Sequence, residues 1–255
     1  MEKLFDINEE GFSIRCKLYY DKTPHDLKHI VLATYGFGGN KDNKAIEKFA
    51  ERITTKYKSF GVVCFDWPCH GKDARNKLII NECLEYMQLV TKHIKNEMKA
   101  EEIYNYSSSF GAYITLRYLH EKEVNPYKKI VFRCPAIKLY DSMTSRITDD
   151  DWAVLNKGRE ILRGYDRKIK ISLEFLDDLK INDVSTYDFL DYADQILMIH
   201  GTKDEMAPIE TTRIFSENNI IELIEVENAD HPFSNPQYMD FAIQKIQEFF
   251  NPEND

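Results

Sequence analysis

The sequence lacks the features of several protein classes. No apolar run in its 255 residues approaches the roughly 18 residues that a membrane-spanning helix needs. The first ten residues, MEKLFDINEE, lack the basic and then apolar order of a signal peptide. Acidic residues outnumber basic ones by 43 to 34, and no run of Lys and Arg with interleaved aromatics is present. We therefore expect a cytoplasmic protein with neither a membrane nor a nucleic-acid partner.

Patterns that would hold a metal or cofactor are also missing. The five cysteines are an odd number without a CxxC pair, which argues against a disulfide framework or a zinc site. The glycine-rich stretch YGFGGN at residues 35–40 is not followed by the Lys and Ser/Thr of a P-loop, and there is no GxGxxG. We expect no metal and no cofactor, and we interpret Cys64 and Cys134 as small buried residues on strands.

What the chain does contain is a regular alternation of strands and helices. Hydrophobic residues make up 43% of it, enough for a large core. An antiparallel hairpin is predicted over residues 3–7 and 11–20. Strands at 29–34, 60–65, 102–106 and 129–133 then alternate with helices at 43–57, 81–99 and from residue 112. This order is typical of a mostly parallel, doubly wound α/β sheet.

The alternation stops between residues 138 and 192 and resumes afterwards. This stretch is charged and irregular, with a hairpin predicted over 161–172 and a helix over 172–179. Strands at 195–200 and 220–226 and helices at 209–217 and 239–250 complete the pattern. We expect residues 1–137 and 193–255 to form the α/β core and residues 138–192 to form a lid inserted after the sixth strand, since long connections are usually functional.

One strand–turn–helix stretch carries a possible nucleophile. Residues 107–111, SSSFG, match the small-x-Ser-x-Gly pattern in which the central residue, Ser109, sits on a sharp turn with its hydroxyl exposed at the end of a sheet. Ser107 stands where this pattern usually has glycine. The alternative is an ordinary helix N-cap, because serine is also a common capping residue.

Other candidate groups follow other strands. Phe37, Asp204 and His231 come directly after predicted strands, as Ser109 does, and ligands of a parallel sheet bind beyond the carboxyl ends of its strands. The order Ser, Asp, His is the one expected of this architecture. With this order of residues, the chain resembles an α/β-hydrolase fold serine hydrolase over nearly its whole length. The stretches that carry the resemblance are YGFGGNK, FDWPCHG, SSSFG, IHGTKD and ENADHPF. The chain is most similar to the bacterial cinnamoyl and feruloyl esterase-like group.

The resemblance implies a mechanism. Ser109 would be the nucleophile, His231 the general base and then acid, and Asp204 the carboxylate that orients the imidazole. The backbone N–H groups of Phe37 and Phe110 would form the oxyanion hole. The family's oxyanion loop usually opens with His-Gly, whereas this one opens with Tyr35-Gly36.

A small lid over the active site suits a small ester as substrate, so we expect short acyl or hydroxycinnamoyl esters to be preferred over long-chain ones. We expect the substrate pocket to include Tyr35, Trp152 and Tyr165. A serine peptidase or thioesterase using the same residues, or a non-catalytic ligand receptor on the same fold, remains an alternative. A homodimer is compatible with the sequence.

Overall fold

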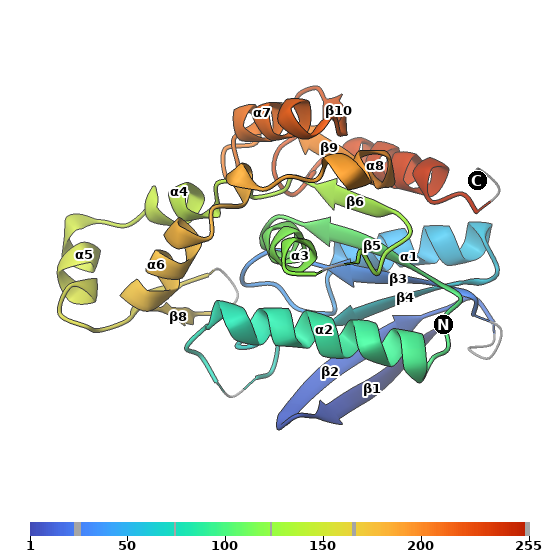
Figure 1. Cartoon of the computed structure of the whole chain (residues 1–255), viewed down its shortest axis with the longest axis horizontal. Coiled ribbons are helices and arrows are strands. Elements are labelled where there is room, and N and C mark those ends of the chain that lie inside the picture. The colour runs from blue at the N-terminus through green and yellow to red at the C-terminus, as the bar shows by residue number, and fades with distance from the viewer. Residues whose placement is uncertain (23–26, 74, 123, 165–166, 253–255) are drawn as a thin grey trace.

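The computed structural model describes residues 1–22, 27–73, 75–122, 124–164 and 167–252. It contains an eight-stranded sheet in the order β1-β2-β4-β3-β5-β6-β9-β10 (Figure 1). Strand β2 pairs antiparallel with β1 and β4, and the other neighbours are parallel. The predicted eight-stranded, mostly parallel sheet is confirmed. Its strands are β1 Glu2–Glu9, β2 Phe12–Tyr19, β3 His29–Thr34, β4 Phe60–Phe65, β5 Glu102–Ser108, β6 Ile130–Arg133, β9 Ile196–Gly201 and β10 Glu222–Val226.

The N-terminal hairpin turns as its sequence predicts. Glu10 and Gly11 both have positive φ, 52° and 82°, which suits a two-residue turn between right-twisted antiparallel strands. At the centre of the sheet the strands are apolar on both faces: every residue of β4 and β6 is buried. A strand buried on both sides needs helices over both of its faces.

The helices provide that cover. Helices α1 (Lys44–Lys56) and α8 (Pro236–Phe249) contact each other on one face, while α2 (Ile80–Asn96) and α3 (Phe110–His120) lie together on the other (Figure 1). Helix α7 (Ile209–Asn219) packs beside β9 and β10. In the described part of the chain, no helix is both long and apolar enough to cross a membrane. All five cysteines are buried and free; Cys64 lies on β4 as expected, whereas Cys134 directly follows the end of β6.

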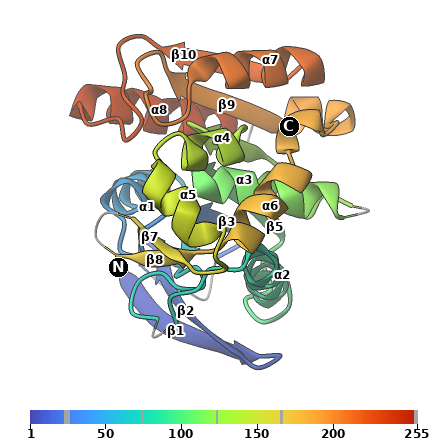
Figure 2. The ribbon, with the colours of Figure 1, turned by 90° about the vertical axis from the view of Figure 1, so that its left-hand side faces the viewer.

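The connection from β6 to β9 lies over the carboxyl ends of the parallel strands (Figure 2). We call residues 138–192 the insertion. It contains α4 Leu139–Thr144, α5 Asp149–Leu155, β7 Ile161–Arg163, β8 Ile169–Ile171, α6 Leu173–Ile181 and the 3₁₀ turn Val184–Thr186, and it ends within a second 3₁₀ turn, Leu190–Gln195. The predicted hairpin and the helix after it are present.

The insertion is more regular than the sequence suggested, because α4 and α5 were not expected. Helix α5 begins with a capping box, in which Thr148 accepts from the Asp151 N–H and the Asp151 carboxylate accepts from the Thr148 N–H. Thr followed three residues later by an acidic residue is close to the Ser/Thr-x-x-Glu signature of a helix start. That signal was available in the sequence.

Candidate active site

Three groups from three strand ends meet at one point. Ser109 follows β5, Asp204 lies in the turn after β9, and His231 lies in the loop after β10. The Ser109 Oγ lies 2.9 Å from His231 Nε2, and His231 Nδ1 lies 2.6 Å from Asp204 Oδ2. The structure therefore brings the three predicted residues together in one hydrogen-bonded chain. With Nδ1–H donating to the carboxylate, Nε2 is left to accept the serine proton.

The backbone of Ser109 is strained in the way that the turn requires. Its φ of 53° and ψ of −119° lie outside the regions that residues with a Cβ prefer. Ser109 precedes α3, but its hydroxyl makes no capping bond to the helix and instead faces His231. The alternative of an ordinary N-cap does not describe this serine.

Two glycines allow the turn and the neighbouring loop to approach closely. A Cβ on Gly111 would overlap the Thr34 hydroxyl and lie 2.9 Å from the Tyr35 carbonyl oxygen. A Cβ on Gly36 would lie 3.1 Å from the Ser109 Cβ. The loop after β3 is thus held directly against the serine.

Asp204 is a strongly stabilised anion. Its Oδ1 accepts from the backbone N–H groups of Met206 at 2.9 Å and Ala207 at 2.8 Å, while Oδ2 faces His231 and also His200 Nε2 at 3.1 Å. Burial opposes ionisation, but the hydrogen bonds from His200, His231 and the backbone outweigh it and hold the pKa of Asp204 well below its usual range.

A second buried histidine therefore shares the carboxylate. His200 Nε2 lies between two acceptors, Asp204 Oδ2 and the Ala207 carbonyl oxygen at 2.8 Å, so this nitrogen carries a proton. Among the described residues, Cys134, His200 and Asp204 form the single cluster of three groups of the type that ligate metals. The protonated Nε2 cannot ligate an ion, whereas Nδ1 of His200 is buried without a hydrogen-bond partner in the ranges that the structure describes and keeps its lone pair. The Asp204 carboxylate already accepts from two backbone N–H groups and faces both histidines, which gives the cluster a hydrogen-bonding role.

The loop after β3 lies beside the serine. Phe37 and Phe110, the two residues predicted to supply backbone donors, both line the cavity that contains Ser109, and their rings pack edge to face at 5.9 Å. As the first residue of α3, Phe110 has an N–H that lacks a partner within the helix. The next residue along the loop, Gly38, donates its N–H to His70 Nε2 at 2.9 Å.

Tyr35 does not line this cavity, which corrects the prediction. It is 1% exposed and points back into the core, where its hydroxyl oxygen accepts from the Trp67 N–H at 3.0 Å. Its carbonyl oxygen accepts from the Trp67 indole N–H at 3.3 Å. The tyrosine braces the start of the loop from behind, a position that its size and its buried hydroxyl both suit.

The prediction for Trp152 is also wrong, and that for Tyr165 falls on a residue outside those that the structure describes. Trp152 lies on α5 and packs against the core of the molecule without lining the cavity. The cavity has a volume of about 610 Å³. Besides the loop after β3, its walls come from the insertion and from the loops that carry Asp204 and His231; the residues from these segments include Leu139, Ser142, Met143, Ser145, Arg146, Arg163, Gly164, Glu205, Met206 and Pro232.

Ser107, which replaces the usual glycine of the elbow, sits in a buried hydroxyl network. It donates to Asn105 Oδ1 at 2.7 Å, accepts from the Thr34 hydroxyl at 2.7 Å and lies 2.9 Å from the Thr115 hydroxyl. The extra side chain is therefore hydrogen-bonded under the turn, and it fills the space that glycine would leave.

Arg133 is a positioning residue that sequence reasoning missed. Its carbonyl oxygen accepts from the Ser109 N–H at 3.2 Å, while its guanidinium donates to the His231 carbonyl oxygen at 2.9 Å. The guanidinium also contacts the Tyr106 hydroxyl at 3.1 Å and lies over the Phe233 ring. One residue at the end of β6 thus touches both the serine and the histidine loops. An arginine in an otherwise apolar strand, IVFR, was the available signal.

No family model matches the sequence, and a comparison with curated proteins finds no match. Solved structures match nearly the whole chain. Est1E from Butyrivibrio proteoclasticus, determined with ferulic acid bound, is 18% identical with a TM-score of 0.75, over 96% of this chain and 97% of that one. The alpha/beta hydrolase domain-containing protein 10 from mouse is 14% identical with a TM-score of 0.69, over 96% and 97%. A monoacylglycerol lipase from Paleococcus ferrophilus is 17% identical with a TM-score of 0.64, over 97% and 98%.

These comparisons establish the class of the fold. The chain has the α/β-hydrolase fold, as its sequence motifs predicted. The expected likeness to the cinnamoyl and feruloyl esterase-like group is confirmed at the level of the fold, since Est1E is among the similar structures. At identities below 20% the likeness does not carry an activity, which has to be argued from the site.

Proposed function

We propose that this protein is a serine hydrolase that cleaves small carboxylic esters through an acyl-enzyme on Ser109. The observation that carries the proposal is the chain of hydrogen bonds from Ser109 Oγ through His231 to Asp204, at 2.9 Å and 2.6 Å, opening onto a cavity. Nucleophile, base and orienting carboxylate in this geometry are what acyl transfer requires.

In this proposal the reaction has two halves. The Ser109 oxygen attacks the ester carbonyl carbon as His231 Nε2 takes its proton, and the tetrahedral oxyanion is stabilised by the N–H groups of Phe37 and Phe110. His231 then gives the proton to the leaving alcohol, which leaves the acyl group on Ser109. Water, activated by the same histidine, attacks the acyl-enzyme and releases the acid. Asp204 stabilises the imidazolium in both halves.

We further propose that the insertion acts as the lid that bounds the substrate. It supplies Leu139, Met143 and Gly164 to the cavity wall. A volume of about 610 Å³ lies within the range of roughly 300–1,000 Å³ of small-molecule sites. We therefore expect higher kcat/KM for short acyl or hydroxycinnamoyl esters than for long-chain esters, and little cleavage of peptides.

The first experiment is labelling with a fluorophosphonate. Ser109→Ala should abolish labelling and nearly all ester hydrolysis, whereas Ser108→Ala, at the adjacent buried serine, should retain both. An unlabelled wild-type protein that still binds ligands would favour a receptor over an enzyme.

The second experiment defines the substrate class. A panel of p-nitrophenyl esters of increasing chain length is compared with hydroxycinnamoyl esters, acyl thioesters and aminoacyl anilides. Preference for esters of twelve or more carbons would contradict the proposed bounded pocket. Faster cleavage of thioesters or anilides would replace the esterase assignment by a thioesterase or a peptidase.

A further inference from the structure

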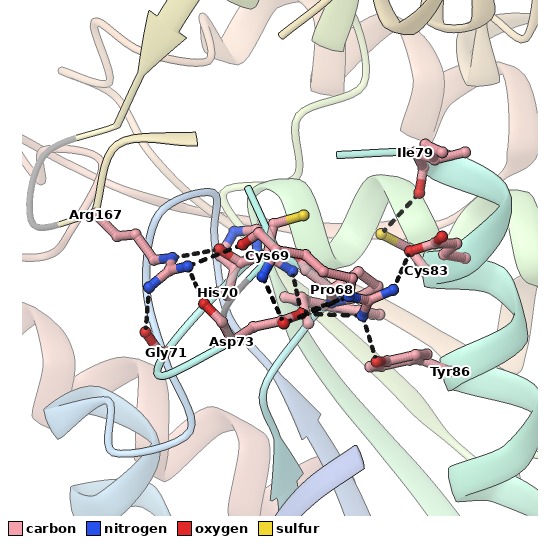
Figure 3. Close-up of polar contacts among 12 residues, drawn as sticks. Pro68, Cys69, His70, Gly71, Asp73, Ile79, Cys83, Tyr86 and Arg167 are labelled. Atoms are coloured by element: carbon pink, nitrogen blue, oxygen red, sulfur yellow. Dashed lines mark hydrogen bonds and ion pairs between the residues drawn. The ribbon is translucent and has the colours of Figure 1, made fainter. Parts of the chain in front are cut away.

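Arg167, in the hairpin between β7 and β8 of the insertion, is bound by the core of the molecule. Its guanidinium donates to four backbone carbonyl oxygens of the loop after β4 (Figure 3): those of Cys69 at 2.6 Å, Gly71 at 3.1 Å, Arg75 at 2.9 Å, and Asp73. We call residues 69–73 and 75 the carbonyl loop. A planar guanidinium with five donors can hold several acceptors in fixed directions, which a lysine ammonium cannot do.

The carbonyl loop needs such a partner. Cys69 and Gly71 have φ values of 67° and 56°, and the left-handed region is disfavoured for a residue with a Cβ such as Cys69. Four carbonyl dipoles that converge on one point repel one another unless a cation lies between them. The conformation of this loop therefore depends on a residue that comes from the insertion, nearly a hundred positions later.

The carbonyl loop in turn supports the loop that flanks Ser109. His70 belongs to it, and its Nδ1–H donates to the Pro68 carbonyl oxygen at 2.8 Å, which leaves Nε2 to accept from the Gly38 N–H at 2.9 Å. Gly38 follows Phe37, the proposed oxyanion donor. A displacement of His70 is thus transmitted through one hydrogen bond to the residue next to the oxyanion hole.

We propose that Arg167 is a positioning residue: it clamps the carbonyl loop so that His70 holds the oxyanion loop at Gly38 in its productive conformation. The inference rests on the proposed function for its catalytic consequence, but the clamp itself can be tested without any activity. The same hairpin lines the cavity through Arg163 and Gly164. One anchor therefore fixes both a wall of the cavity and the oxyanion loop.

The electrostatics of His70 agree with this arrangement. Burial lowers the pKa of His70 to about 4, the carbonyl oxygen of Pro68 and the charge of Asp73 oppose the shift, and the charge of Arg167 adds to it. The imidazole also packs against the rings of Tyr35, Phe37 and Phe110, which carry no charge. His70 is therefore neutral at physiological pH and keeps the acceptor that Gly38 requires.

The test compares Arg167→Gln and Arg167→Lys with Arg159→Gln, a matched control at an exposed arginine of the same insertion. Hydrogen exchange is followed by mass spectrometry in peptides that cover residues 36–40 and 69–75. Arg167→Gln should speed exchange in both peptides by about tenfold or more while the control stays at the wild-type rate, because the amide of Gly38 loses its fixed acceptor. Unchanged exchange at 36–40 would overturn the proposal.

Steady-state kinetics on a short p-nitrophenyl ester add the catalytic readout. Arg167→Gln should lower kcat by about 10- to 100-fold with KM within about twofold, since the donors act on the transition state and a small misplacement is enough. Arg167→Lys retains the charge but not the four directed bonds, and its kcat should lie between those of Arg167→Gln and wild type. A rise in KM with kcat unchanged would instead make Arg167 a part of the cavity wall and refute the positioning role.

A double-mutant cycle with His70→Gln identifies the route. If Arg167 acts through His70, the effect of Arg167→Gln on kcat should largely disappear in the His70→Gln background. Full additivity of the two losses would refute transmission through His70. If wild-type protein hydrolyses no ester at all, the proposed function fails, while the exchange rates still decide whether Arg167 holds the loop.

Discussion

The substitution Arg133→Met should lower the catalytic rate strongly while changing the stability of the fold only slightly. The guanidinium of Arg133 is buried, and its contacts are with neutral groups: the His231 carbonyl oxygen, the Tyr106 hydroxyl and the Phe233 ring. Two charge-assisted hydrogen bonds contribute about 1.5–3 kcal/mol each, and the cation–π contact contributes up to about 2 kcal/mol. Against them stands the desolvation of a buried ion, several kcal/mol.

Because these contributions nearly cancel, methionine should change the free energy of unfolding by no more than about 2 kcal/mol. Activity should respond differently. Without the donor from β6, the His231 loop is no longer held in register with the serine, and a misplacement of that kind lowers kcat by about 10- to 100-fold. Urea denaturation followed by circular dichroism gives the first quantity, and hydrolysis of p-nitrophenyl acetate gives the second.

Arg117→Met is the matched control. Arg117 is an equally buried arginine two turns along α3, but it pairs with the carboxylates of Asp178 and Glu121. Its loss should lower the free energy of unfolding by about 1–3 kcal/mol and leave kcat close to the wild-type value. The positioning role of Arg133 would be wrong if the folded Arg133→Met protein kept the wild-type kcat. In that case the arginine would act on stability alone, and a destabilisation of more than about 4 kcal/mol would be expected.

Three further predictions concern other parts of the site. The pKa of His70 is about 4 in the folded state and about 6.5 in the unfolded state, so unfolding takes up a proton between these pH values. The contribution of His70 to the free energy of unfolding should therefore fall by about 3 kcal/mol from pH 7 to pH 4. Chemical denaturation at both pH values should show that this loss is absent in His70→Gln. Gly111→Ala should destabilise by about 3 kcal/mol, because its Cβ overlaps Thr34 and crowds the Tyr35 carbonyl; an alanine variant with wild-type Tm would contradict this packing. Ser107→Ala should lower the free energy of unfolding by about 1–3 kcal/mol through the broken hydroxyl network, yet keep kcat within about threefold of wild type, which labelling and kinetics would check.

The sequence by itself determined the fold and the three residues at its centre. Strands β3, β4 and β6 are short, mostly apolar runs, β5 carries β-branched and aromatic residues, and helices α1 and α2 are amphipathic, so the alternation and the doubly wound sheet follow from local patterns. Ser109 could be found because a strained turn between strand and helix requires a small residue such as Gly111, and a local steric need leaves a local signature. Asp204 and His231 could be found because parallel strands end at the same edge of the sheet.

Only the tertiary structure decided where the long side chains point. Tyr35 begins the loop that flanks the serine but turns inward to Trp67, and Trp152 packs against the core, because a large ring goes wherever the surrounding packing leaves space. The contacts of Arg133 and Arg167 join segments about 100 residues apart. No periodicity or motif records such a pairing, since guanidinium donors are satisfied by whichever carbonyl groups the fold brings within reach.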